Sequence, residues 1–158
     1  GNTPVFVALD VVDLRRAGDH YMKLRKIYES IVSLMEKYLP DEVAFEAPFY
    51  GKNVQSMLKL GRAQGVAMAA VLSRDVPVFE YAPRKIKLAI TSAGDASKEQ
   101  VAGMLMRMFD LKTMPKNLDA TDGLAAAVCH FYQNGIEVSK SGSKSWEDFI
   151  RKNPGRIK

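Results

Sequence analysis

Apolar positions follow two different spacings along the chain, and each spacing predicts one kind of element. Short, β-branched apolar runs at residues 5–12, 43–46 and 77–81 predict three strands. Elsewhere apolar residues recur every three or four positions, which is typical of amphipathic helices. The predicted helices span about residues 21–38, 53–72, 84–90, 98–109 and 119–133. Strands and helices therefore alternate, which predicts an α/β domain whose helices cover a sheet.

Local signals mark several of the predicted ends. Asp19 follows Gly18 and can cap the first helix, and Pro40 ends that helix. Pro83 stops the third predicted strand. Ser97 and the residue three positions later, Gln100, form a capping-box pattern. The fourth helix is therefore expected to begin directly after Ser97.

The composition changes near residue 134 and divides the chain in two. Residues 1–134 are expected to form the folded domain, and residues 135–158 a flexible basic tail. The run at 139–145 alternates Ser with Lys and Gly, as flexible linkers do. The tail from residue 134 holds six Lys and Arg against three acidic residues. It is either an extension that touches DNA or, more simply, a solvated and mobile end.

Composition and charge narrow the function classes. A chain of 158 residues suits one domain, and no apolar run approaches the length of a membrane span. The net charge of +5 favours an anionic partner, commonly nucleic acid, although many basic proteins bind none. The one cysteine, Cys129, excludes an internal disulfide and indicates a reducing cytoplasm. One cysteine and only two histidines, His20 and His130, also argue against a structural zinc site.

Three carboxylates stand where chemistry is possible. Glu46 ends an otherwise apolar strand, at the rim of the sheet where α/β proteins build sites. Asp119 and Asp122 open the last helix and, being three residues apart, share one face. Taken singly, each signal is more simply an exposed strand end or a helix cap. Taken together, they suit a Mg²⁺ site, because hard cations prefer carboxylate oxygens and magnesium nucleases need converging carboxylates.

Aromatic and basic residues surround these carboxylates in the sequence. Phe49 and Tyr50 follow Glu46 and are placed to stack on an unpaired base, although Phe49 fits the core equally well. A basic set suits the tracking of phosphates, although each member alone is more simply a solvated surface charge. The set contains Lys52, Lys59, Arg62, Arg84, Lys85, Lys87 and Lys98.

Small residues recur at four-residue steps along the helix at 53–72. They are Gly61, Gly65 and Ala69. Such a row lets another backbone approach closely, either the sheet or a partner helix. The sequence pattern alone slightly favours the sheet.

Four motifs resemble the RuvC-type Holliday junction resolvases. They are FEAPFYGKN at 45–53, LKLGRAQGVA at 58–67, FEYAP at 79–83 and DATDGLAAA at 119–127. The resemblance runs in order from about residue 8 to residue 133. It implies a ribonuclease H-like fold, a mixed sheet flanked by helices, and a homodimer. It also implies Mg²⁺-dependent symmetric nicking of four-way DNA junctions in recombination and repair, with Mn²⁺ as a substitute ion. The expected partners are junction DNA and the branch-migration machinery of the RuvA and RuvB type.

The same resemblance assigns roles to single residues. Glu46, Asp119 and Asp122 match the catalytic, metal-binding acids, and Phe49 matches an aromatic that inserts at the junction. Lys87 and Lys98 match basic residues near the scissile phosphate; with Phe49, Lys52 and Arg84 they make up the expected DNA-binding set. The small residues Gly61, Gly65 and Ala69 lie on the helix that the family uses for dimerisation. The resemblance therefore favours a partner helix, rather than the sheet, as the surface that packs against them.

One feature departs from the family pattern. The family's first strand ends in Asp-Pro-Gly and supplies a fourth metal ligand, and this tripeptide does not occur here. Asp10 imitates it but lies only 36 residues before Glu46. Residues 5–14 match the family's third strand instead, so the first two strands are expected to be absent from this chain. Two further hypotheses follow: a module that binds branched DNA without cutting it, and a structural domain of a larger complex.

Overall fold

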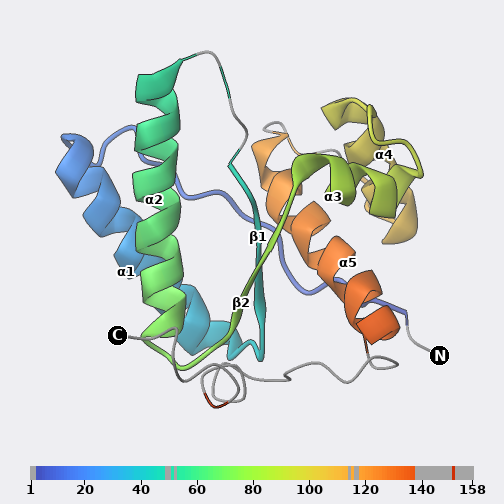
Figure 1. The fold of residues 1–158 in the computed structure, drawn as a ribbon, viewed down its shortest axis with the longest axis horizontal. Helices are drawn as coiled ribbons and strands as arrows, with labels where there is room; N and C mark the ends of the chain where they lie inside the picture. The colour runs from blue at the N-terminus through green and yellow to red at the C-terminus, as the bar shows by residue number, and fades with distance from the viewer. Residues whose placement is uncertain are drawn as a thin grey trace.

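The computed structural model describes residues 3–48, 51, 53–113, 115, 118–137 and 151. Within these ranges, helices and strands alternate as the apolar pattern predicts (Figure 1). In chain order the elements are α1 (His20–Tyr38), β1 (Val43–Glu46), α2 (Val54–Leu72), β2 (Val78–Tyr81), α3 (Pro83–Thr91), α4 (Lys98–Met108) and α5 (Asp119–Glu137).

The two described strands form a parallel pair at the centre of the molecule. Val43 pairs with Val78, and the register continues to Glu46 and Tyr81, so both strands end at the same edge. Parallel neighbours need a crossover connection, and α2 provides it. Helices α1 and α2 lie on one side of the pair, and α3, α4 and α5 lie on the other (Figure 1). This α/β arrangement confirms the predicted fold class.

The helix ends follow the signals in the sequence. The Asp19 side chain accepts a hydrogen bond of 2.9 Å from the Met22 amide and caps α1. The capping box of α4 is complete, because Ser97 and Gln100 each accept a bond from the other's amide, at 3.1 Å and 2.8 Å. The third predicted strand, β2, ends at Tyr81, and Pro83 is the first residue of α3, a position that the fixed φ of proline suits.

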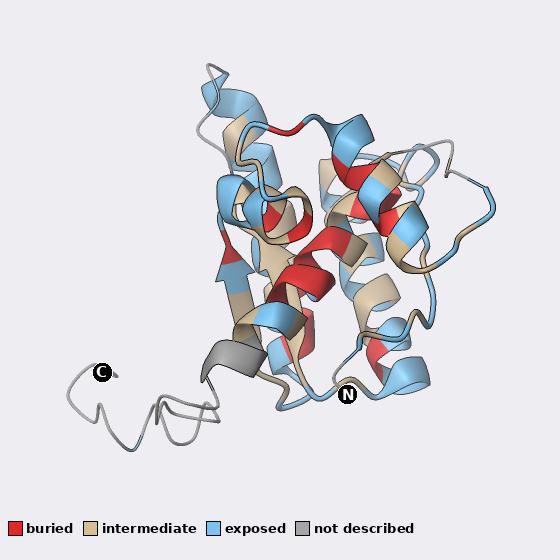
Figure 2. Cartoon of the chain, turned by 90° about the vertical axis from the view of Figure 1, so that its right-hand side faces the viewer, coloured by how far each residue is buried: buried red, intermediate tan, exposed pale blue. Residues whose placement is uncertain are grey.

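The main core lies between the strands and helices α3 to α5. It contains Tyr81 from β2, Ile86 and Ile90 from α3, Leu105 from α4, and a stretch of α5 around Cys129. Figure 2 shows these buried stretches gathered in the middle of the molecule. Burial of this one face fixes the direction of α5, whose first turn carries Asp119 and Asp122.

The strand predicted at residues 5–12 does not form. Val5 and Val7 are 83% and 75% exposed, and Phe6 packs against Phe109 with ring centroids 5.8 Å apart. A strand needs a partner for its backbone hydrogen bonds, and among the described residues this segment pairs with neither β1 nor β2. The prediction of a strand from this short, β-branched apolar run was therefore wrong.

Helix α5 continues to Glu137, four residues beyond its predicted end. Apart from these last helical residues and Arg151, the predicted tail at 135–158 lies outside the described residues. Each helix that the structure describes is too short or too polar to cross a membrane.

Candidate active site

Glu46 stands at the carboxyl end of β1, and two hydrogen bonds fix this strand end. The Ala47 amide donates to the carbonyl oxygen of Tyr81 at 2.8 Å, which continues the parallel pairing. From α2, Gln64 Nε2 donates to the carbonyl oxygen of Glu46 at 2.6 Å. The backbone of Glu46 is thus held from both sides, and its half-buried side chain is placed at the edge of the sheet.

Asp119 and Asp122 occupy the first turn of α5, where the helix dipole favours negative charge. Lys98, the first residue of α4, bonds to both of them. Its Nζ atom lies 3.0 Å from Asp119 Oδ1 and 3.3 Å from Asp122 Oδ2. The ammonium group therefore offsets the repulsion between two neighbouring carboxylates.

A cavity of about 590 Å³ joins the strand end to this helix start. Glu46 and Asp122 line it together with Lys98 and two basic residues of α3, Arg84 and Lys87. Asp119 is not among the residues that line the cavity, but it is bonded to Lys98, which does line it. Phe49 and Lys52, also predicted site residues, lie outside the described residues. Two carboxylates and three cationic side chains thus line the same cavity.

The charges in this cavity act on each other. The pKa of Glu46 is raised, mainly by burial and next by the negative charge of Asp122, while Lys98 and Lys87 oppose the shift. The pKa of Lys98 is raised chiefly by its hydrogen bond to Asp119. Lys98 is therefore held in its charged form, and Glu46 takes up a proton more readily than a free glutamate.

The donor chemistry suits a hard divalent cation. The acidic groups offer only carboxylate oxygens, and the repulsion between Glu46 and Asp122 is one that a cation would relieve. Among the described residues, however, no three acidic, imidazole or thiol side chains are already gathered as a metal site. The Lys98 ammonium stands between the two aspartates instead. Glu46 and Asp122, which line the cavity, would hold the ion, and Lys98 bonds one oxygen of Asp122 and one of Asp119.

Two residues that shape the cavity were not singled out from the sequence. A Cβ atom on Gly94 would lie 2.8 Å from Arg84 Cζ, so the absence of a side chain there lets the guanidinium rest against the loop. Thr121 lines the cavity, and its hydroxyl donates to the carbonyl oxygen of Leu118 at 2.6 Å. Gly94 is visible in the sequence only as a loop glycine, and Thr121 only as part of a motif.

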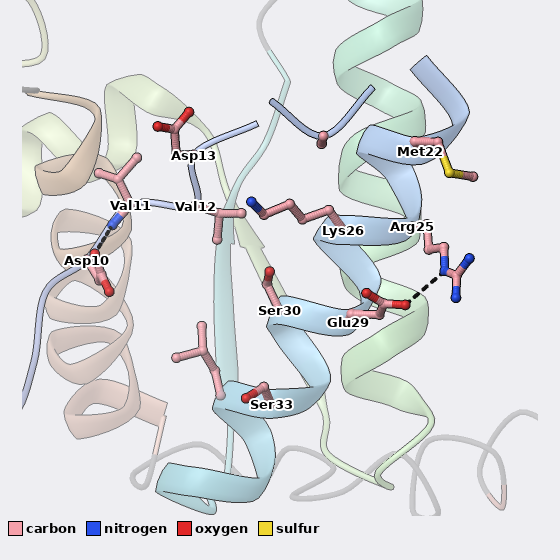
Figure 3. Close-up of a pocket in the computed structure, with 12 residues that line it drawn as sticks. Asp10, Val11, Val12, Asp13, Met22, Arg25, Lys26, Glu29, Ser30 and Ser33 are labelled. Carbon is pink, nitrogen blue, oxygen red and sulfur yellow. Dashed lines mark hydrogen bonds and ion pairs between the residues drawn. The ribbon is translucent and has the colours of Figure 1, made fainter. Parts of the chain in front are cut away.

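Asp10 lies elsewhere. It lines a separate cavity of about 770 Å³ between the N-terminal segment and α1 (Figure 3). Its carboxylate accepts a hydrogen bond of 2.7 Å from the neighbouring Val11 amide. Neither Glu46 nor Asp122 lines this second cavity, so the structure does not bring Asp10 together with the candidate active site.

Comparison with known proteins gives consistent matches along the chain. The family model for crossover junction endodeoxyribonuclease RuvC matches residues 1–130. The RuvC protein of Bacteroides fragilis is 63% identical over 160 residues, covering 100% of this chain and 85% of the relative. The RuvC protein of Porphyromonas gingivalis is 55% identical over 163 residues, covering 100% of this chain and 86% of that relative. Among solved structures, T. thermophilus RuvC in complex with Holliday junction substrate matches with a TM-score of 0.77 and 27% identity, over 85% of this chain and 82% of that one.

Proposed function

Because the chain belongs to the RuvC family of crossover junction endodeoxyribonucleases, it is a metal-dependent nuclease that resolves Holliday junctions, and we propose that Glu46 and Asp122, with Asp119, form its metal-binding catalytic centre. The fold is ribonuclease H-like, as the structural match indicates. We further propose Mg²⁺ as the ion, with Mn²⁺ able to replace it, since both accept carboxylate ligands. We also propose that the enzyme nicks two strands of the four-way junction symmetrically.

The observation that carries this proposal is the shared cavity. Glu46 and Asp122 line it together with Arg84, Lys87 and Lys98, so carboxylates that can bind a cation share one cavity with basic groups that can bind a phosphate. A bound Mg²⁺ would supply an activated water and stabilisation of the leaving oxygen. The guanidinium of Arg84 suits a bidentate grip on a phosphate, and Lys87 suits a single charge-assisted bond.

The remaining DNA contacts stay predictions. Phe49 is proposed to stack at the junction and Lys52 to contact a phosphate, and both follow from the family motif. Junction DNA as a ligand is supported by the T. thermophilus complex. Contact with branch-migration machinery of the RuvA and RuvB type rests on the family resemblance alone. A cytoplasmic location agrees with this DNA substrate and with the single buried, free cysteine, Cys129.

A homodimer is proposed through one face of α2. Gly61, Gly65 and Ala69 are all exposed, so this row of small residues does not pack against the sheet. Leu58 and Leu72 extend the row and are 57% and 43% exposed. An apolar stripe whose middle consists of small residues lets the same helix of a second copy approach closely. A two-fold dimer would then place two active sites on a two-fold junction.

The test compares cleavage with binding. The wild-type chain, Glu46→Gln and Asp122→Asn are incubated with a four-way junction and Mg²⁺, and junction binding is measured separately in EDTA. Both variants should lose nicking on the order of 100-fold or more, because the ion is no longer positioned, while binding in EDTA is kept. Glu80→Gln is the matched control, since Glu80 is an exposed carboxylate on the neighbouring strand and does not line the cavity. Nicking by Glu46→Gln at the wild-type rate would contradict the proposed centre, and binding without any wild-type nicking would favour a module that only binds junctions.

A further inference from the structure

A chain of hydrogen bonds crosses the core between the sheet and α5. The hydroxyl of Tyr81 lies 2.5 Å from His130 Nδ1, and His130 Nε2 lies 2.6 Å from Glu42 Oε2. Tyr81 and His130 are each 8% exposed. The ring of Phe79 packs on the imidazole, with centroids 4.4 Å apart. These three bonded residues are called the Tyr81–His130–Glu42 link below.

The link joins the two elements that carry the candidate catalytic acids. Tyr81 pairs with Glu46 in the register of the sheet, and Glu42 directly precedes β1. His130 lies on α5 eight residues after Asp122, which is just over two helical turns. The helix that presents Asp122 is thereby bonded to Glu42, just before the strand that presents Glu46, and to Tyr81, the residue of β2 that pairs with Glu46.

At its start α5 is also bonded through Asp119 and Asp122 to Lys98, and along the core its contacts are mainly apolar. Its buried face toward the core consists largely of small side chains, among them Ala125, Ala126 and Cys129. Apolar burial holds such a helix on the sheet but is not directional, so it does not by itself define the position of α5 along its own axis. Hydrogen bonds are directional, and in a buried setting they are also strong.

The chemistry of the three groups is complementary. An ionised carboxylate only accepts hydrogen bonds, so Glu42 accepts from Nε2–H of His130. In the neutral ring, Nδ1 then accepts from the hydroxyl of Tyr81. The two bonds fix the orientation of the imidazole, and through it they restrain α5 relative to the start of β1 and the end of β2.

We infer that the Tyr81–His130–Glu42 link is a positioning device that sets the separation of Glu46 and Asp122 and thereby the affinity of the site for its metal ion. The inference rests on the proposed function, because it takes these two acids as metal ligands. None of the three residues lines the cavity. Their effect passes through the placement of β1 and α5.

The decisive variant is Tyr81→Phe, which removes the hydroxyl and keeps the ring, including its contact with the Lys85 ammonium 5.3 Å away. Mn²⁺ binding in the absence of DNA is followed by electron paramagnetic resonance of the free ion, and nicking is measured against metal concentration. We expect the Mn²⁺ affinity to fall about tenfold and the metal concentration for half-maximal nicking to rise by a similar factor, as is usual when a residue that orients a ligand is altered. Junction binding in EDTA should stay within twofold of wild type.

Tyr132→Phe is the matched control, because Tyr132 also lies on α5 but is 38% exposed and contacts Met108 Sδ at 3.8 Å. It should behave as wild type. Glu42→Ala should reproduce the loss of metal affinity, and Glu42→Gln should restore most of it, because an amide oxygen still accepts from Nε2–H.

Wild-type metal affinity in Tyr81→Phe would overturn the inference, as would a parallel loss of junction binding in EDTA, which would show only a weakened fold. Failure of the wild-type chain to bind Mn²⁺ or to nick would instead count against the proposed function.

Discussion

At the scale of single residues, the charge of Asp122 acts on Glu46 across their shared cavity. The pKa of Glu46 is raised by burial first and by Asp122 second. Asp122→Asn removes that second cause, so the pKa of Glu46 should fall while remaining under the influence of burial. The titration of the Glu46 carboxyl carbon, followed by NMR in EDTA, measures the change. An unaltered midpoint would show that the two side chains do not interact.

The same shift predicts how the stability of the chain depends on pH. A carboxyl whose pKa is raised on folding destabilises the fold once it ionises, so stability is lost as pH rises from the ordinary value of 4.5 through the folded pKa. Glu46→Gln cannot ionise. It should therefore melt a few degrees above wild type at pH 7 and close to wild type at pH 4, as measured by circular dichroism. A higher melting temperature for wild type at pH 7 would contradict the sign.

Lys87 offers a test of phosphate contact. It lines the cavity from α3, and its removal should lower the slope of log junction affinity against log salt by roughly one unit. Lys98→Ala should do the same, with a larger loss of affinity, because it also uncovers Asp119 and Asp122. Lys37→Ala on α1 is the control, since Lys37 is exposed and lines neither cavity. Equal slopes in all three variants and wild type would mark these lysines as ordinary surface charges.

At the scale of elements, the start of α4 fixes where Lys98 lies. Ser97 caps this helix, and Lys98 is its first residue. Ser97→Ala removes one side of the capping box and should lower the free energy of unfolding by about 1 kcal/mol, as urea denaturation would show. Ser33→Ala, at an exposed position within α1, should change it by less than about 0.5 kcal/mol. Equal effects would mean that the cap contributes nothing specific.

The sequence predicts these elements well where the deciding signal is local. Ser97, Gln100 and Asp19 cap helices through residues three positions away, so their signals can be read directly from the chain. The prediction of a strand at residues 5–12 was wrong because a strand forms only where another strand, distant in the sequence, pairs with it. In the site, Glu46 and Asp122 follow from carboxylate chemistry and the family motif. The Tyr81–His130 and His130–Glu42 bonds join residues 49 and 88 positions apart, and no local pattern reveals them.

At the scale of the whole molecule, the proposed dimer interface is the exposed face of α2 that carries Gly61, Gly65 and Ala69. Wild type should sediment as a dimer at micromolar concentration. Gly65→Leu should give monomers without a loss in melting temperature, because among the described residues nothing lies within 4 Å of a Cβ placed at Gly65. A Cβ at Gly103 of α4 also meets open space, so Gly103→Leu is the control and should stay dimeric. A wild-type monomer under these conditions would count against the proposed interface.

Because Cys129 is buried, the reactivity of its thiol can report how often α5 separates from the core. Its thiol is the single one in the sequence, is 0% exposed, and has a pKa raised by burial. Alkylating reagents attack the thiolate, so they reach Cys129 only when α5 separates from the core. The alkylation rate thus counts open molecules without any introduced label. A cysteine placed on the surface would be the one fast-reacting thiol, which allows a single fluorophore to be attached at a chosen point and followed as a junction binds.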